Sequence, residues 1–589
     1  MANLIFDLLV LWALLILAAV TLLGWGRLVE RAVGLGVSPR IKSETLWLGF
    51  VALLGAVDLM HLAVKVDWIA SLGCLLVGVV GCLMHGGVGW KAFFQGLVRQ
   101  IQSRPLTAVA VVGLAIAWCL RGMGMPNNFD SGLYHFASIR WINEQPLVPG
   151  VGNLHWRLAL NQSYFGFVAL LNVAPLWGKG YSAGGLLILL LSTATLLETC
   201  SKCDRLWYRV VGGLLAIYLG YLASGVANPA PDGVVSMMQL AIFLLLFCAL
   251  AREQPRTGRS LLGCVVILAL CLGLAMVKLS GAAYALVCGL LAVAVYRKEI
   301  EEGLGTIAKF AVFLLLAAVI HLGRGYLLSG YPLFPASFAG IPALDWAVSP
   351  DVLRHESDLI LTWARAPGSL DSVGVLAGWA WLRPWAWGLP LSVQLAYLWC
   401  ALLTVAALVC IMTNRVDGAV RRCGVLFAPL LAAVAFWLGT APDPRFLGAV
   451  PVLLAGLSTW IVLSSRGFES LAGWIANPPP RSPAMIAFTI LICLACLKLT
   501  GMRSAGFNGW SALPVPSVHT RVTQSGLAVL VPVERGQCWN APLPCASIFD
   551  ANLRSVDWAP LAIGPLRLLE RPVFFVRNPH AVGVSPGTH

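Results

Sequence analysis

The sequence predicts an all-α polytopic membrane protein of about 14 transmembrane helices, and two observations lead to this prediction. Hydrophobic residues make up 59% of the 589 residues, charged residues only 11%, and the mean hydropathy is +0.82. Soluble globular domains do not have this composition. Apolar runs of about 20 residues, long enough to cross a hydrocarbon core, recur along the chain. They leave too little polar sequence for a large soluble domain.

The apolar runs define the predicted spans in order. The first run, MANLIFDLLVLW, lacks a basic start and a cleavage site, so we interpret it as a span and not as a signal peptide. The predicted spans lie near residues 4–25, 46–65, 68–89, 105–122, 182–199, 208–225, 234–251, 261–278, 280–296, 306–326, 388–412, 423–440, 446–464 and 484–500.

Basic residues set the predicted orientation. The net charge is +14, but the cations stand in short clusters between spans, a pattern that does not favour a nucleic-acid partner. The positive-inside rule places these clusters in the cytoplasm, and the N-terminus and the C-terminal tail then face outward. If the stretch 162–177 crossed the membrane, the basic segment SKCDRLWYR would face outward. We therefore predict a helix that dips into the outer interface, with Tyr164 and Trp177 as aromatic anchors.

The chain divides into three predicted parts. Residues 1–104 supply additional transmembrane helices, residues 105–501 form a transmembrane core with outer loops 123–181 and 327–387, and residues 502–589 form a small extracytoplasmic α/β domain. Strand-like runs in this domain are GLAVLVPV and RPVFFVR. Cys538 and Cys545 flank WNAPLP there, a spacing that favours a disulfide in an oxidising compartment. A zinc pair is the alternative, but a second pair of ligands is lacking nearby.

This threading gathers many polar side chains at the outer face, where carboxylates and cations together suit an anionic lipid-linked substrate. The candidate site residues are Asp130, Tyr134, His135, His155, Arg157, Asp232, Lys278, Arg324, Asp443 and Arg445.

Each candidate has a structural alternative. Asp130 can accept a proton from an attacking hydroxyl, or it can cap the helix that begins at SGLYHFASIRWI. The cations can hold a phosphate, or they can extend from helix ends toward lipid headgroups. A lone His is more often a hydrogen-bonded structural group. Acidic residues that we expect to be solvated are Glu144, Glu356 and Asp358, the last two because an amphipathic helix needs a polar face.

Several of these motifs resemble a family of bacterial polytopic membrane proteins related to the GT-C class of glycosyltransferases. The matching pieces run from about residue 126 to 554 in order: FDSGLYHFASIRWINE, VPGVGNLHWRLALNQSYF, NPAPD, KLSG, RGYLLSGYPLFP, DWAV, APDPRF and QCWNAPLPC. The resemblance implies a GT-C-like core in the inner membrane, with interface helices after the first long outer loop. In this chain three spans precede the one that leads into that loop, whereas the loop commonly follows the first span in the class.

The resemblance also implies a function. Asp130 would be the catalytic base of a glycosyltransferase that moves a sugar from a polyprenyl-phosphate-linked donor to an envelope glycan or lipid acceptor on the periplasmic face. Arg324 would bind the donor phosphate, with Lys278 and Arg445 as further candidates. Some members of the class use a divalent metal, but the sequence has no DxD pair, so no cofactor has a defined site. There is no Walker A motif. The alternatives are a carrier or flippase for a lipid-linked glycan, and an oligosaccharide polymerase or ligase.

Overall fold

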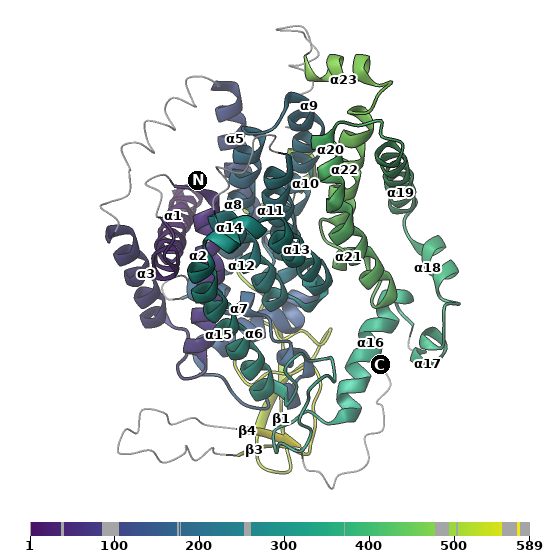
Figure 1. The fold of residues 1–589 in the computed structure, drawn as a ribbon. Helices are drawn as coiled ribbons and strands as arrows, with labels where there is room; N and C mark the ends of the chain where they lie inside the picture. The colour runs from purple at the N-terminus through teal and green to yellow at the C-terminus, as the bar shows by residue number, and fades with distance from the viewer. Residues whose placement is uncertain are drawn as a thin grey trace.

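The fold is that of a helical bundle with small strand pairs at one end (Figure 1). It is seen in a computed structural model. The structure describes residues 2–36, 41–84, 105–173, 176, 178–251, 261–369, 371–477, 494–501, 503, 505–556 and 574–577.

Eight helices among the described residues are long and apolar enough to cross a membrane. They are α1 (Ala2–Val33), α2 (Ser43–His61), η4 with α8 (Gly180–Cys200), α9 to α10 (Arg205–Ala223), α11 (Pro231–Ala251), α15 (Leu304–Ser329), α19 (Leu391–Met412) and α20 to α21 (Gly418–Gly439). Shorter apolar helices are α3 (Trp68–Leu83), α5 (Pro105–Gly122), α12 (Leu261–Val277), η6 with α13 (Leu279–Val295) and α22 (Val450–Leu463).

These helices indicate a membrane protein, and they overlap the predicted spans up to residue 464. The last predicted span, 484–500, lies mostly outside the described residues, so the predicted number of spans is not confirmed. Two short helices, α14 (Arg297–Glu302) and α23 (Glu469–Ala476), lie between or after the long ones.

Small residues let the first three helices pack closely. A Cβ atom added at Gly24 of α1 would lie 1.7 Å from the backbone oxygen of Gly78 in α3. A Cβ atom at Gly26 would lie 2.0 Å from the backbone oxygen of Thr45 in α2. Backbones can approach this closely in a membrane only where side chains are absent or small.

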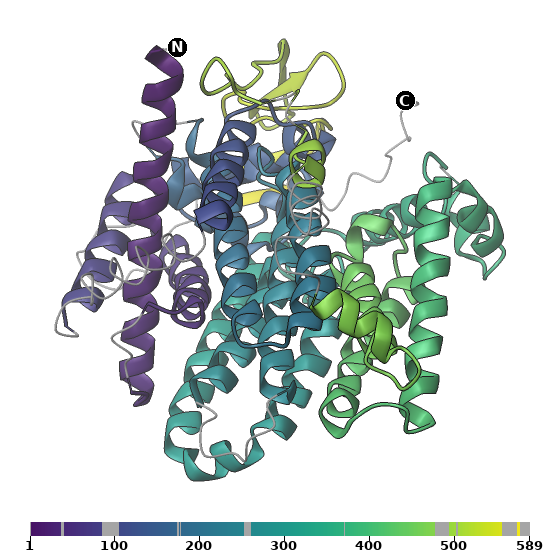
Figure 2. The same ribbon diagram turned by 90° about the horizontal axis from the view of Figure 1, so that it is seen from above.

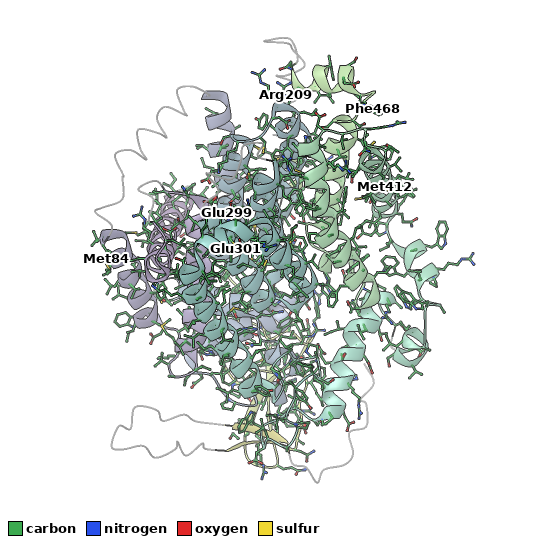
Figure 3. All side chains as sticks on the ribbon, in the orientation of Figure 1. Met84, Arg209, Glu299, Glu301, Met412 and Phe468 are labelled. Atoms are coloured by element: carbon green, nitrogen blue, oxygen red, sulfur yellow. A yellow bond between two sulfur atoms is a disulfide. The ribbon has the colours of Figure 1, made fainter. Side chains whose placement is uncertain are left out.

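Contacts between distant segments define the two ends of the bundle. At one end the amide of Trp510 donates to the Asp7 carboxylate near the start of α1, and the amide of Gly506 donates to the carbonyl of Leu120 in α5. We call this end, which also carries the strands, the strand end; in Figure 2 the N-terminus and the strands lie at the same edge of the bundle. At the opposite end the Ser43 hydroxyl donates to Glu198. Figure 3 labels side chains at helix ends away from the strands, including Met84, Arg209 and Phe468.

The segment predicted as the first outer loop, whose name we keep together with that of the second, forms a set of short helices at the strand end. In order they are η1 (Ser131–His135, a π-helix), α6 (Phe136–Glu144), η2 (Val151–Asn153), η3 (Trp156–Ala159) and α7 (Ser163–Leu171). Helix α7 has 9 residues, about half of what a span needs. Tyr164 is fully buried and its ring packs against Phe167, so the prediction of an interface anchor is wrong for this residue. Trp177 lies outside the described residues.

The second outer loop contains α16 (Pro350–Arg365), α17 (Ser372–Leu376) and α18 (Leu382–Gly388). Ser349 caps α16 by accepting from the amide of Val352. Leu353 packs into a small apolar cluster with Ala159 of η3 and Val348. The start of α16 therefore lies against the first outer loop.

The described part of the tail beyond residue 505 contains strands and no helix, so a small sheet is shown there and the α/β unit stays a prediction. Strand β1 (Val518–Val522) pairs antiparallel with β2 (Ala528–Pro532), and β3 (Leu553–Val556) pairs antiparallel with β4 (Phe574–Arg577). The run GLAVLVPV contains β2 and the run RPVFFVR ends in β4, so strands occur where the sequence predicted them. Cys538 and Cys545, for which the sequence predicted a disulfide, are bonded to each other.

Candidate functional site

Asp130 stands at the entrance to the π-helix η1, and its side chain does not cap this helix. Its backbone is helical (φ −61°, ψ −24°) and its carboxylate makes no capping hydrogen bond. The Asn128 side chain accepts from the Asp130 amide instead, at 2.9 Å. The structural alternative for Asp130, a helix cap, is therefore not the role that its carboxylate plays. Single π turns within helices are frequent at functional sites.

Two guanidinium groups hold the Asp130 carboxylate, one at each oxygen. Nη1 of Arg157, on η3, lies 2.9 Å from Oδ1 of Asp130, and Nη1 of Arg445 lies 3.3 Å from Oδ2. Arg445 belongs to the short helix η8 (Pro444–Phe446) between α21 and α22. Residues 130, 157 and 445 are far apart in the sequence, so the fold brings them together. Each oxygen of the Asp130 carboxylate therefore faces a positive charge.

Next to these three residues lies a second group of ion pairs. Asp443 caps η8 by accepting from the amide of Arg445, and its Oδ2 lies 2.9 Å from Nε of the same residue. Lys278, at the end of α12, pairs with Asp232 in the first turn of α11. The Phe446 ring joins the two pairs, because the Lys278 ammonium lies 4.3 Å and the Arg445 guanidinium carbon 5.1 Å from its centre.

Glu356 completes the arrangement, although the sequence predicted a solvated role for it. It lies on α16 with its side chain 1% exposed, and its Oε1 is 3.4 Å from Nε of Arg157. Burial raises the pKa of Glu356 to about 7, against the lowering effect of the Arg157 charge. The signal in the sequence was its spacing: Glu356 follows Leu353 by three positions and therefore shares the buried face of the helix.

We call these residues the polar cluster: Asp130, Arg157, Asp232, Lys278, Glu356, Asp443 and Arg445. The acidic members outnumber the basic ones by one, and each cation is already paired with a carboxylate. The side chain of Arg445 is 44% exposed, against 23% for Arg157 and 16% for Lys278. Arg445 is therefore the cation that an incoming anion reaches most easily.

Three further candidate site residues, Tyr134, His135 and His155, lie around the polar cluster. The Arg157 guanidinium lies over the Tyr134 ring, 5.7 Å from its centre, and burial raises the pKa of Tyr134 well above its ordinary range. Burial lowers the pKa of His135 to about 3, so its ring is neutral at pH 7. Burial likewise lowers the pKa of His155 to about 3, and its Nδ1 accepts from the Arg157 amide. His155 therefore positions the backbone next to Arg157.

Arg324 lies outside the polar cluster, in a separate buried network that the sequence analysis missed. Its Nη1 lies 3.6 Å from Oδ1 of Asp58 on α2 and donates to the Asn161 side chain at 2.6 Å. Asp58 also receives hydrogen bonds from Ser163 and His321. These contacts give no support for the predicted role of Arg324 as a donor-phosphate ligand. Asp58 was visible in the sequence as an acid inside an apolar run.

The disulfide loop of the tail packs on the π-helix next to Asp130. The Trp539 amide donates to the Gly132 carbonyl at 2.9 Å, and the Gln537 side chain donates to the Phe129 carbonyl at 2.7 Å. Arg140 of α6 donates to the carbonyl of Asn540 at 2.8 Å. The backbone on both sides of Asp130 is therefore fixed by residues about 400 positions away in the sequence.

We expect the substitution Gly132→Ala to destabilise this contact. The new Cβ would lie 2.4 Å from the Trp539 ring, which packs against Phe136, so the ring or the π-helix must move. Overpacking of this kind costs roughly 1–3 kcal/mol. Thermal unfolding of the purified variant should show a lower transition temperature. Gly113→Ala is the matched control, because its Cβ would meet no atom within 4 Å; an equal loss in both variants would contradict the prediction.

No group of three or more His, Cys, Asp or Glu side chains suited to a metal ion occurs within the described ranges. The polar cluster interleaves carboxylates with cations, so its acids are already paired within the protein. Among the described residues, the acids of the polar cluster therefore do not offer a metal ion a set of ligands that is free of cations.

Comparisons with known proteins identify a family without an assigned activity. A family model described as "Domain of unknown function (DUF8201)" matches residues 8–451, a range that contains the whole polar cluster and ends before the tail. No curated protein and no solved structure matches the chain. Because the match covers most of the 589 residues, the chain belongs to the DUF8201 family.

Proposed function

We propose that the protein is a membrane glycosyltransferase of the GT-C type that uses a polyprenyl-phosphate-linked sugar donor. The donor's sugar would pass to an envelope glycan or lipid acceptor at the strand end, which we assign to the periplasmic face of a bacterial inner membrane. Asp130 would be the base. The observation that carries this proposal is the position of Asp130 between Arg157 and the more exposed Arg445.

The two guanidinium groups suggest how donor binding would activate Asp130. A phosphate group binds Arg by the same two-pronged geometry as a carboxylate and carries more charge, so it can compete for the exposed Arg445. Lys278 also lies over the Phe446 ring, 4.3 Å from its centre, and can contribute a second positive charge. Once Arg445 binds the phosphate, Oδ2 of Asp130 becomes free, while Arg157 still holds Oδ1. The base is thus released only when the donor is in place.

The transfer itself then needs few groups. The acceptor oxygen attacks the anomeric carbon, the bond from this carbon to the phosphate oxygen breaks, and the hydroxyl proton moves to Oδ2 of Asp130. The bonding electrons leave with the phosphate, whose negative charge Arg445 and Lys278 stabilise. This leaving group is an anion already, so a general acid is not required. A single displacement inverts the anomeric centre.

The location of the charges favours an enzyme over a carrier or flippase. Carriers place their binding residues near the bilayer midplane on broken helices. The polar cluster lies on loops and helix ends. The buried Asp58 lies only three residues before the last residue of α2, about 5 Å along the helix axis, and is therefore also close to the rim.

The test is a transfer assay with the purified protein in lipid nanodiscs. A panel of polyprenyl-monophosphate and polyprenyl-diphosphate sugars is offered with lipid and glycan acceptors, and product formation is followed by mass spectrometry. We expect transfer from one donor class with inversion at the anomeric carbon. A protein that forms no product in the panel, but moves a lipid-linked glycan across vesicle bilayers, would refute the proposal in favour of a carrier. Extension of the acceptor by whole oligosaccharide units would identify a polymerase or ligase.

A further inference from the structure

The buried carboxyl of Glu356 has no part in the transfer as described above, yet it lies in contact with the site. Its partner Arg157 makes two ion pairs at once, through Nη1 to Asp130 at 2.9 Å and through Nε to Glu356 at 3.4 Å. One guanidinium therefore connects a carboxyl of the first outer loop with a carboxyl of the second. Both carboxyl groups compete for the same cation.

We propose that Glu356 is a positioning residue, whose buried carboxyl holds the Arg157 guanidinium so that only one of its nitrogens binds Asp130. This inference rests on the proposed function. An Arg free to turn would bind both oxygens of a carboxylate in the two-pronged arrangement that guanidinium groups favour. Asp130 would then have no free oxygen for the acceptor proton. The charge of Glu356, 3.4 Å from Nε, opposes this by fixing the orientation of the guanidinium, with Nε turned toward Glu356 and Nη1 toward Asp130.

The location of Glu356 allows it to hold this position firmly. Helix α16 is anchored next to Arg157 by the packing of Leu353 on Ala159. At its other end Arg365 donates to the carbonyls of Gly439 and Thr440, just before Asp443. The helix therefore braces both sides of the polar cluster.

The groups around Glu356 define its response to pH. Arg157 and Trp156 face it from η3, Asp130 adds a negative charge, Tyr134 lies beyond Arg157, and His355 of the same helix packs on Trp156. Because the pKa of Glu356 is raised to about 7 from an ordinary 4.5, the carboxyl loses its charge when the pH falls below about 7. The neutral carboxyl no longer holds Arg157 by charge, so the rate of sugar transfer should fall as the pH falls below about 7.

Glu356→Gln tests the inference, because it keeps the size of the side chain and removes the charge. We expect transfer at pH 8 to fall about 10- to 100-fold, and the loss of activity below about pH 7 that the unaltered protein shows should be absent. Glu356→Asp should restore part of the rate together with the pH dependence. Asp351→Asn is the control, because this carboxylate of the same helix is 86% exposed and pairs with Arg354 at the surface.

Two measurements remain informative if no transfer is found. The raised pKa of Glu356 makes its contribution to stability complete below about pH 4.5, and this contribution is lost as the pH rises to about 7. Melting temperatures of the unaltered protein should therefore fall relative to Glu356→Gln as the pH rises from about 4.5 to about 7. A structure of Glu356→Gln should show two guanidinium nitrogens of Arg157 bound to the Asp130 carboxylate, one at each oxygen. An unchanged Arg157, or unchanged activity and pH profile in an active enzyme, would overturn the inference.

Discussion

Replacing Asp130 by Asn is expected to reduce transfer by at least about 10²-fold while leaving the protein folded, because an amide cannot take the acceptor proton. The fold should survive because each cation keeps a second carboxylate: Glu356 lies 3.4 Å from Arg157, and Asp443 lies 2.9 Å from Arg445. The measurement is the initial rate in nanodiscs with the donor identified by the panel, together with the melting temperature and the elution volume of the detergent-solubilised protein.

Glu144→Gln is the control for this experiment. Glu144 ends α6 in the same loop and pairs with Arg140, and its side chain is 31% exposed. The pair is partly buried, but Gln keeps the size of the side chain and Arg140 keeps its hydrogen bonds to the carbonyls of Asn540 and Ala541, so the variant should retain both fold and activity. A fully active Asp130→Asn enzyme would remove Asp130 as the base. Binding of the donor phosphate should persist in Asp130→Asn, because Arg445 and Lys278 remain.

The sequence was informative about the helices because a membrane imposes one strong requirement. Each span must be apolar over enough residues to cross the hydrocarbon core, and the predicted ranges overlap the apolar helices of the structure up to residue 464. Helices shorter than a span need not meet this requirement. The run around Tyr164 is as apolar as a span, yet it forms a 9-residue helix buried within the protein, and hydropathy does not separate burial in lipid from burial in protein.

The polar cluster could be predicted in part, for a related reason. Charged residues at the ends of apolar runs must lie near the rim, so Asp130, Asp232, Lys278 and Arg445 were recognisable as candidates that meet at one face. Their pairing was not recognisable, because it depends on how helices far apart in the sequence pack. Glu356 was missed since an amphipathic helix in a loop usually turns its acids to water.

Arg324 illustrates a contact that the sequence analysis did not foresee. Its position at the outer end of a span suggested a phosphate ligand, but no pattern in the sequence indicated that Asp58, 266 positions earlier, would reach it across the bundle. The contact between the disulfide loop and the π-helix was equally hidden, because Trp539 and Gly132 carry no pattern that links them.

Arg324→Met is expected to destabilise the protein by roughly 3–5 kcal/mol, because it leaves the carboxylate of Asp58 without its cation in a buried site. The side chains of Asp58 and Arg324 are 1% and 5% exposed, so water cannot replace the lost partner. Met has a similar length and fills the space of the aliphatic part of Arg. The measurement is thermal or denaturant unfolding in one detergent, with Arg354→Met as the control, since the Arg354 side chain is 71% exposed.

The double variant Asp58→Asn with Arg324→Met separates a structural role of Arg324 from a direct role in donor binding. Removing both charges takes away the unpaired ion, so the double variant should lose less stability than Arg324→Met alone, because the two substitutions are coupled through one ion pair. His321 and Ser163 can still hydrogen bond to the amide that replaces the Asp58 carboxylate.

If Arg324 acts only through this network, the folded double variant should transfer sugar at a rate within a few-fold of the unaltered protein. If the double variant folds well but its apparent affinity for the donor falls by a large factor, Arg324 contacts the phosphate after all. The donor would then extend from Arg445 across the first outer loop toward α15.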